Sequence, residues 1–353
     1  MINFQISCFE RGVALSTLID DLLLPDNLPD PTGSVDLVQT HISLVFVADK
    51  FVYKIKKPVD FGFLDFSTLE KRRYYCEKEI ELNSRLAQNI YLDLLPVIFD
   101  GKCHRIVDRQ MVNSGGRVVE YCVKMRRIPE EGLMKNLFHR GELRSSHLRQ
   151  LAKVLARFHR HAKRGPEIDQ FGLPEKFKVN TDENFSQVQP YVGLTIDKAA
   201  FEAIREWTEA FYSNYGNIFL ERIKQGRVRD GHGDLHMEHI CFEGDKISIF
   251  DCIEFNDRFR YADQLADISF LLMDLEFHGG DEQAEFFWDS YKTEASEGNV
   301  ERLLTFYKVY RAFVRGKVNS FQLDDPGISH EKKQQAVSTA RKYFDLALKY
   351  VKQ

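Results

Sequence analysis

The stretch of sequence that decides the fold is residues 232–254, which read HGDLHMEHICFEGDKISIFDCIE. Two short runs of β-branched and aromatic residues flank a Glu-Gly-Asp turn, a pattern that predicts a small β-hairpin. Asp234 and Asp251 fall at the two ends of this hairpin, so we expect their carboxylates to be close in space. One such carboxylate can accept a hydroxyl proton while the other holds a divalent metal ion. Two solvated turn aspartates are the alternative, but the neighbouring histidines and the hairpin favour the chemical interpretation.

The segment resembles the catalytic segment of aminoglycoside phosphotransferases and related small-molecule kinases, which share the protein-kinase-like fold. The residues that carry the resemblance are His232-Gly233-Asp234-Leu235-His236, the hairpin and Phe250-Asp251. It continues in residues 263–268, where two aspartates match the family's Gly-Asp-Pro-x-x-Asp-Leu-Ala segment, although the glycine and the proline are absent. Residues 151–159, LAKVLARFH, are similar to the family's Leu-Ala-x-Leu-His helix. The resemblance covers residues 36–320.

A more particular resemblance lies in residues 40–66. They look like an uncharacterised bacterial branch of the superfamily, whose members are sometimes fused to a P-loop kinase domain. The Gly-x-x-x-x-Gly-Lys-Ser/Thr signature of a P-loop does not occur in this sequence. We therefore expect the phosphotransferase part alone.

The resemblance implies an α+β fold of the bilobal protein-kinase-like (aminoglycoside phosphotransferase-like) type, with a β-rich N-lobe and a helical C-lobe. The expected elements fit this order: a hairpin of residues 42–48 and 51–55, a helix from 69 to 87 behind a capping box of Ser67 and Glu70, and strands at 104–112 and 117–125. After Pro129 the sequence is mostly helical. We expect a nucleotide-binding lobe over residues 1–128 and a catalytic and acceptor-binding lobe over residues 129–353.

The resemblance also implies roles for three residues of the catalytic segment. Asp234 becomes the catalytic base, and Asp251 becomes the ligand of Mg²⁺ that bridges the phosphates of ATP. The family's second metal ligand is an asparagine five residues after the base, where this sequence has His239. Because a neutral imidazole suits Mn²⁺ or Zn²⁺ better than Mg²⁺, Mn²⁺ is the alternative metal. A substrate contact and an ordinary surface histidine are the other interpretations of His239.

In this fold a lysine of the third strand contacts the nucleotide phosphates and pairs with a helix glutamate. Lys54 matches that position best, Lys56 is second, and Glu79 is the expected partner. The two lysines share one face of the predicted strand because side chains alternate. An edge strand that carries lysines for solubility is the alternative.

A glycine-rich phosphate loop is missing between the first two strands. We therefore expect the side chains of Ser43 and His41 to meet the phosphates through hydrogen bonds. Backbone groups around Met125 and Arg127 are expected to meet the adenine edge.

The sequence does not name the hydroxyl acceptor. In this fold the C-terminal helices line the acceptor pocket, where Arg311 and Arg315 form an i, i+4 pair and are candidates for an acidic substrate group. His236 and Glu254 are further substrate candidates. An aminoglycoside pocket would be strongly acidic, and this region is not. The basic run 135–164 is either a solvated helix face or a contact for an anionic substrate or RNA.

The composition limits the class of protein. In 353 residues, 49 basic and 53 acidic side chains leave a net charge of -4, which does not favour nucleic acid as a partner. Six scattered cysteines without a C-x-x-C pair are typical of reduced thiols. Since neither a long apolar run nor a secretory signal is visible, we expect a cytoplasmic protein without a membrane partner. The oligomeric state stays open.

These features predict an ATP-dependent phosphotransferase that moves the γ-phosphoryl group to a hydroxyl of a small-molecule or macromolecular acceptor. Two alternatives stay open. His239 and the missing glycine-rich loop suggest a nucleotide-binding pseudokinase that acts as a regulator or scaffold. The basic run alone suggests a protein or RNA kinase that acts as a growth regulator.

Overall fold

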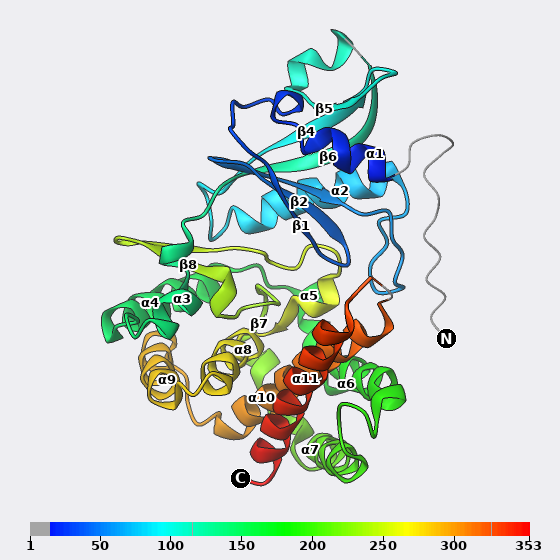
Figure 1. Cartoon of the computed structure of the whole chain (residues 1–353). Helices are drawn as coiled ribbons and strands as arrows, with labels where there is room; N and C mark the ends of the chain where they lie inside the picture. The colour runs from blue at the N-terminus through cyan, green and yellow to red at the C-terminus, as the bar shows by residue number, and fades with distance from the viewer. Residues whose placement is uncertain (1–14, 115, 326) are drawn as a thin grey trace. The chain divides into compact units, whose positions relative to one another are not determined.

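The computed structural model describes residues 15–114, 116–325 and 327–353, and Figure 1 shows the chain as a cartoon. Internal contacts divide the chain into two compact units. The first unit contains the chain up to Asn136 together with Ile240–Asn256, and the second contains Leu137–His239 and Asp257–Gln353. The chain therefore leaves the first unit, returns to it for one segment and leaves it again.

The first unit is built around an antiparallel six-stranded sheet, with its strands in the order β1-β2-β3-β6-β4-β5 (Figure 1). Along the chain, the elements of this part are α1 (Leu15–Leu22), β1 (Asp36–Gln39), β2 (Ser43–Val47), β3 (Phe51–Lys56), α2 (Leu69–Asn83), β4 (Tyr91–Phe99), β5 (His104–Ile106) and β6 (Arg117–Arg126). The predicted hairpin of β2 and β3 is confirmed, with Lys54 opposite Val45 on one side and Val123 on the other.

The two faces of this sheet are covered by different helices, because successive side chains of a strand point to opposite sides. Leu18 of α1 belongs to the same buried cluster as Tyr53. Cys76 of α2 belongs to a second cluster with Val123. Lys54 follows Tyr53 directly and so lies on the face that α2 covers, as the alternation of the sequence predicts.

The predicted hairpin after the catalytic segment is present as β8 (Ile240–Glu243) and β9 (Lys246–Ile249), and it belongs to the first unit. Arg126, at the end of β6, donates hydrogen bonds to both carboxylate oxygens of Glu243, at 2.9 and 2.5 Å. Gly132 allows a close approach, since a Cβ at this position would lie 2.4 Å from the carbonyl oxygen of Phe242. A bidentate ion pair between Arg126 and Glu243 and the close approach at Gly132 therefore attach the hairpin to the rest of the first unit.

Helices make up most of the second unit (Figure 1). After α3 (Met134–His139), which spans the change of unit, the elements are α4 (Ser145–His161), α5 (Pro166–Asp169), α6 (Pro174–Val188), α7 (Lys198–Lys224), β7 (Val228–Asp230), β10 (Tyr261–Asp263), α8 (Gln264–Phe277), α9 (Asp281–Ala295), α10 (Glu301–Phe321) and α11 (His330–Val351). β7 and β10 pair as a short antiparallel ribbon. The sheet of the first unit and the helices of the second confirm the expected α+β class.

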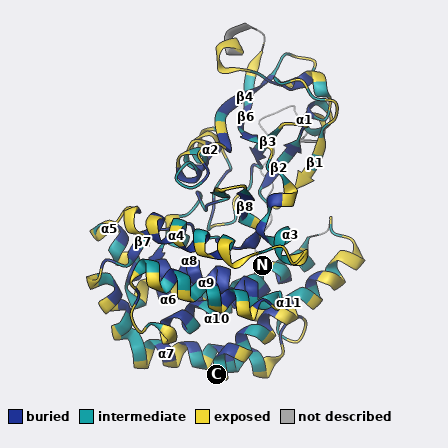
Figure 2. Cartoon of the chain, turned by 90° about the vertical axis from the view of Figure 1, so that its left-hand side faces the viewer, coloured by how far each residue is buried: buried dark blue, intermediate teal, exposed yellow. Residues whose placement is uncertain are grey.

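The most buried helix of the second unit is α8, which has no exposed residue from Gln264 to Leu275. The helices around it alternate buried and exposed residues along their length (Figure 2). Phe313 of α10 packs on Phe344 of α11 with ring centroids 5.1 Å apart. Phe277 of α8 stacks on Tyr343 of α11 at 3.7 Å. α8 therefore lies in the core of the second unit.

Local structure differs from the sequence predictions at several points. The strand predicted at 104–112 ends at Ile106, and Arg109–Ser114 form a 3₁₀ turn. The N-cap of α2 is Thr68, whose hydroxyl accepts from the amide of Lys71 at 3.3 Å. Ser67 is not the cap because its hydroxyl donates to Asp65 at 2.5 Å. The division of the chain after Asn136 lies close to the expected change at 128/129, and the functional assignment of the two lobes stays a prediction.

The described cysteines are free thiols: Cys76, Cys103, Cys122, Cys241 and Cys252. Cys8 lies outside the described residues. Among the helices of the described ranges, none combines the length and the apolar character needed to cross a membrane.

Two glycine-to-alanine substitutions should change stability in opposite directions. Gly316→Ala in α10 would bring a Cβ within 2.6 Å of the buried ring of Phe344. We expect this overpacking to lower the free energy of unfolding by about 1–3 kcal/mol. Gly216→Ala in α7 meets only Pro174, at 3.9 Å, and should raise it by up to about 1 kcal/mol because alanine favours a helix. Urea unfolding of both variants measures the two changes, and changes of equal sign would contradict the packing described.

Candidate functional site

Five charged residues of the first unit form a group that we call the lysine cluster: Lys54, Lys56, Glu79, Asp251 and Glu254. The Nζ atom of Lys54 lies 2.8 Å from Oε1 of Glu79 and 2.8 Å from Oδ1 of Asp251. Burial would lower the pKa of Lys54, but the charges of Asp251 and Glu79 outweigh it and raise the pKa well above its usual value. Lys54 is therefore a charged ammonium, and its expected ion pair with Glu79 is present.

Lys56 is the second lysine of the cluster, and it is 1% exposed. Its Nζ atom lies 2.7 Å from Oε2 of Glu79, and it also forms an ion pair with Glu254. Burial would lower the pKa of Lys56, but Glu254 and Glu79 raise it above its usual value. We expected Glu254 to contact substrate. Since it is buried against Lys56, we now assign Lys56 and Glu254 to the support of Glu79 and no longer propose Glu254 as a substrate residue.

Asp251 has an unusual backbone conformation, with φ at 61°. Non-glycine residues seldom adopt this left-handed region, and the surroundings must hold them there. The amide of Asp251 donates to the hydroxyl of Tyr91 at 3.1 Å, and the amide of Cys252 donates to Oδ1 of Asn83 at 2.9 Å. Tyr91 and Asn83 were not found from the sequence, because nothing in their local pattern points to a partner about 160 residues away.

The other residues expected to meet a nucleotide lie on β2, on β6 and just after it. Ser43 is 1% exposed, and its hydroxyl has no hydrogen-bond partner among the residues that the structure describes. Met125 is buried opposite Val52. The amide of Arg127 donates to the carbonyl oxygen of Lys50 at 2.9 Å, so this donor is used within the unit. The nucleotide contacts of Ser43, Met125 and Arg127 stay predictions.

In the second unit, the loop before Asp234 is held by Asp267 of α8. The carboxylate of Asp267 accepts from the amide of His232 at 2.7 Å and from the amide of Gly233 at 2.8 Å. His159 lies 3.3 Å from the same carboxylate. Burial would raise the pKa of Asp267, but the hydrogen bond with His159 and nearby positive charge lower it below its usual value. Asp267 is therefore a buried anion that fixes the backbone leading to Asp234.

Arg311 holds the same loop from α10. Its Nη1 donates to the carbonyl oxygen of Gly233 at 2.9 Å, and its Nε donates to the carbonyl oxygen of Ala266 at 3.1 Å. The side chain is buried, and its guanidinium packs over the ring of Phe270 at 4.8 Å. Because these donors are used inside the unit, we revise the prediction that Arg311 binds an acidic substrate group and assign it to the positioning of the loop.

The residues after Asp234 are held by a carboxylate further along α8. The amide of Met237 donates to Oδ2 of Asp274 at 3.0 Å. Asp274 follows Asp267 by two helical turns and so lies on the same face of the helix. Asp274 was not among the residues predicted from the sequence, although its spacing from Asp267 is a signal that could have found it.

Asp234, His236 and His239 form a second group, which we call the Asp-His-His cluster. Oδ2 of Asp234 lies 3.6 Å from Nε2 of His236 and 3.5 Å from Nδ1 of His239. Burial would raise the pKa of Asp234, but His236, His239 and Arg315 outweigh it and lower the pKa below its usual value. Asp234 is therefore a carboxylate, and 34% of its side chain is exposed.

Arg315 is the cation that acts on this cluster. It lies one helical turn after Arg311, and Asp234 is one of the groups that raise its pKa. Its guanidinium packs over the ring of Tyr343 at 5.5 Å. The Nε atom is buried and has no hydrogen-bond partner in the described part of the chain. The side chain also hydrogen-bonds Tyr343. Of the two arginines that the sequence singled out, Arg315 is therefore the one whose charge lowers the pKa of Asp234.

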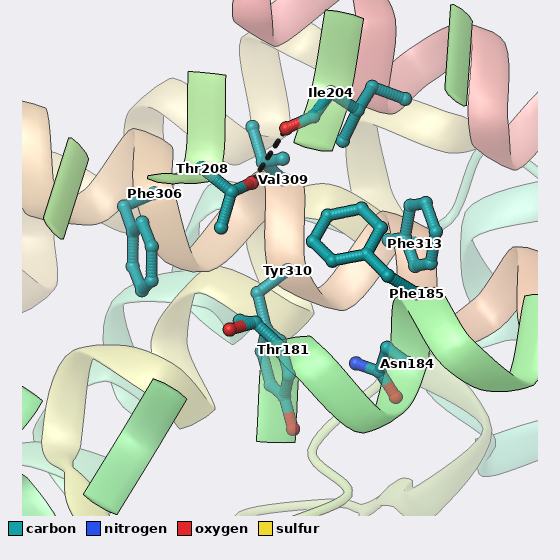
Figure 3. Close-up of a pocket in the computed structure, with 9 residues that line it drawn as sticks. All are labelled: Thr181, Asn184, Phe185, Ile204, Thr208, Phe306, Val309, Tyr310 and Phe313. Carbon is teal, nitrogen blue, oxygen red and sulfur yellow. Dashed lines mark hydrogen bonds between the residues drawn. The ribbon is translucent and has the colours of Figure 1, made fainter. Parts of the chain in front are cut away.

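Figure 3 shows a cavity in the second unit between α6, α7 and α10. Its wall includes Phe185, Phe306 and Phe313 with the polar groups Thr181 and Asn184. The volume is about 10 Å³, which is room for about one water molecule. This cavity is too small for a substrate.

Two groups of residues could hold a cofactor or a metal ion. In the first unit, Lys54 offers an ammonium and Asp251 a carboxylate that is 43% exposed, a donor set that fits a nucleotide phosphate with its divalent metal. In the second unit, one ligand atom each of Asp234, His236 and His239 lies within 4.8 Å of the other two. The expected closeness of Asp234 to Asp251 joins residues of different units and stays a prediction.

Comparison with known sequences gives one family and two relatives. The sequence profile of the phosphotransferase enzyme family matches residues 76–303. An uncharacterised protein of Mycobacterium tuberculosis is 33% identical over 284 residues, which are 80% of this chain and 54% of that protein. A Mycobacterium bovis protein matches over the same shares. The chain therefore spans about half the length of the curated relatives it matches.

Comparison with solved structures shows a shared fold. A choline/ethanolamine kinase family protein from Mesorhizobium loti has a TM-score of 0.51 and 15% identity, covering 91% of this chain and 92% of that chain. A choline kinase from Cryptosporidium parvum has a TM-score of 0.50 and 12% identity, covering 95% of each chain. At such identities the likeness shows the fold alone, and it confirms the kinase-like fold class that the sequence indicates.

The role of Asp267 predicts a large cost for its neutral variant. Asp267→Asn removes a buried anion that serves two amides and His159, so we expect the free energy of unfolding to fall by about 3 kcal/mol. Asp182→Asn is the matched control, because Asp182 is exposed and pairs only with Lys178 on its own helix. Its effect should stay below about 0.5 kcal/mol. Denaturant unfolding at neutral pH measures both, and equal effects would contradict the assignment.

The difference in stability between the wild type and Asp267→Asn should depend on pH. The folded-state pKa of Asp267 is depressed, so its contribution to stability is present above the unfolded pKa of about 3.9 and is lost as the pH falls. The difference between the wild type and Asp267→Asn should therefore shrink as the pH is lowered from about 5 to about 3.

Proposed function

The chain belongs to the phosphotransferase enzyme family, and from this premise we propose that it transfers the γ-phosphoryl group of ATP to a hydroxyl of an acceptor. The family assignment confirms the resemblance found in residues 232–254. The nucleotide, the acceptor and the roles of single residues belong to the proposal. One observation carries it: the ammonium of Lys54 lies 2.8 Å from the carboxylates of both Glu79 and Asp251.

In this proposal the lysine cluster binds the nucleotide. Bound ATP would supply the phosphoryl group, and Mg²⁺ or Mn²⁺ would neutralise the negative charge of the phosphates. Lys54 holds phosphate oxygens, Asp251 holds the metal ion, and Glu79 with Lys56 keeps Lys54 in place. Because the transition state of phosphoryl transfer is loose, positioning and charge neutralisation are the main tasks of the protein.

Asp234 acts on the acceptor in this proposal. Its carboxylate accepts a hydrogen bond from the reacting hydroxyl and takes up the proton as the phosphoryl group is transferred. A depressed pKa makes Asp234 a weak base, so orientation of the hydroxyl is the larger part of its contribution. The hydrogen bonds of Asp267 and Arg311 to the backbone of Gly233 support this role. They hold the carboxylate of Asp234 in position, and a displaced carboxylate could not orient the acceptor hydroxyl.

Arg315 supports an acceptor that carries an acidic group. Its positive charge helps to lower the pKa of Asp234, and the same charge would attract an anionic group of the acceptor. A cation next to Asp234 also disfavours a cationic acceptor such as an amino sugar. We therefore propose a hydroxyl compound with a phosphate or carboxylate group as the substrate class.

Substitution of the two aspartates should separate binding from turnover. Asp251→Ala should abolish the rise in thermal stability that ATP with Mg²⁺ produces, because the metal ligand is lost. Asp234→Asn should keep this rise but lower the rate of ADP formation by about 100-fold or more. Asp245→Asn, an exposed carboxylate in the hairpin turn, is the matched control and should behave as the wild type.

The opposite results are equally informative. Full ADP formation by Asp234→Asn would exclude its role as base. A wild type that binds ATP but forms no ADP with any hydroxyl compound would favour the regulatory pseudokinase instead.

The proposed acceptor class is tested with Arg315. We expect sugar phosphates to stimulate ADP formation more than amino sugars do. Arg315→Gln should raise the KM for the anionic acceptor by about tenfold, the loss of one charge-assisted hydrogen bond. Arg341→Gln is the control, because Arg341 is exposed and bonds only the carbonyl oxygen of Leu194. A preference for cationic acceptors that Arg315→Gln leaves unchanged would refute this class.

A further inference from the structure

We propose that Asp234, His236 and His239 bind a transition-metal cation such as Zn²⁺, with all three protein ligands supplied by the second unit. All three ligands come from one short stretch of the second unit, with the spacing Asp-x-His-x-x-His. One ligand atom of each residue lies within 4.8 Å of the other two. Two imidazoles with one carboxylate are a donor set for Zn²⁺ and similar metals, whereas Mg²⁺ prefers oxygen ligands alone.

The distances in the cluster are close to those of a metal centre. Two ligand atoms of a tetrahedral zinc ion are about 3.3 Å apart. Oδ2 of Asp234 and Nε2 of His236 are 3.6 Å apart, and one ligand atom of each of the three residues lies within 4.8 Å of the others. Rotation of the side chains would have to shorten the longer of these distances to complete the site.

Burial and hydrogen bonding prepare the two histidines for this role. His236 is 2% exposed, and its Nδ1 is buried without a hydrogen-bond partner in the described ranges. His239 has its Nδ1 2.9 Å from the carbonyl oxygen of Asp234. A ligating histidine commonly donates its second ring N–H to such an acceptor, which fixes the ring and leaves the lone pair on the other nitrogen.

Charges around the cluster act in both directions. Arg315 opposes a cation, whereas Glu238 favours one, with Oε2 3.9 Å from Nδ1 of His236. Asp234 has 34% of its side chain exposed, so a metal ion can reach the cluster and keep an open coordination position.

Occupation of this site has a consequence that rests on the proposed function. Asp234 cannot both ligate Zn²⁺ and accept a proton from the acceptor hydroxyl. Zn²⁺ should therefore inhibit the phosphoryl transfer that Mg²⁺ supports. The binding itself does not depend on the proposed reaction and is tested without nucleotide.

The experiment titrates the full chain, stripped of metal with a chelator, with Zn²⁺ in competition with a chromophoric chelator. We expect one Zn²⁺ per chain, and binding weakened by at least about tenfold in His236→Ala and in His239→Ala. His161→Ala is the matched control, because His161 is exposed and, among the described residues, bonds the carbonyl oxygen of Arg157 on its own helix. Asp251→Ala should also bind Zn²⁺ like the wild type. Co²⁺ should give visible absorption bands that both cluster variants lose.

The variants also decide against the proposal if it is wrong. Loss of Zn²⁺ binding in Asp251→Ala would assign the ion to the nucleotide position. Unchanged binding in His236→Ala and His239→Ala, or no binding by the wild type, would overturn the site. His239 has 14% of its side chain exposed, so His239→Ala keeps the test valid if thermal unfolding without metal shows that His236→Ala is misfolded. A wild type that binds Zn²⁺ but catalyses no transfer would refute the proposed function and leave the metal site standing.

Discussion

The backbone that leads to Asp234 is buried, and its amides must find acceptors other than water. Asp267 provides them for His232 and Gly233. The carboxylate cannot move away, because α8 is buried from Gln264 to Leu275. The position of Asp234 therefore follows from how α8 packs in the core of the second unit. Arg311 adds the complementary contact, since its guanidinium donates a hydrogen bond to the carbonyl oxygen of Gly233 in the same loop.

The lysine cluster depends on a different constraint, which is the cost of burying charged side chains away from water. Three carboxylates surround two ammonium groups, and each buried charge has a partner within hydrogen-bond distance. Removal of one partner would leave another charge unpaired, which is costly in a buried position. The surplus negative charge resides on Asp251, the member whose side chain is 43% exposed. The cluster is thus neutral inside and acidic at its edge, which favours a cation there.

Sequence reasoning found what depends on local pattern and missed what depends on distant partners. Strand alternation put Lys54 and Lys56 on one face, and the family resemblance led us to expect Glu79 as the partner. The same reasoning treated Arg311 and Arg315 alike, because they share one helical stripe. Only tertiary contacts separate them: Arg311 meets two carbonyl groups, whereas Arg315 packs over Tyr343. The supports of Asp251 were out of reach for the same reason, since Tyr91 and Asn83 come from β4 and α2.

The return of the chain to the first unit through Ile240–Asn256 has a consequence for the order of folding. Lys54 and Lys56 are synthesised early, but Asp251 and Glu254 leave the ribosome nearly 200 residues later. Until then, Lys54 and Lys56 share Glu79 as their carboxylate partner within the cluster. The nascent first unit therefore carries a net positive charge in a region that is later buried. Contacts of such long sequence separation form slowly. The sheet can assemble during translation, but its charged interior closes only after Leu137–His239, about half of the helical unit, has been made.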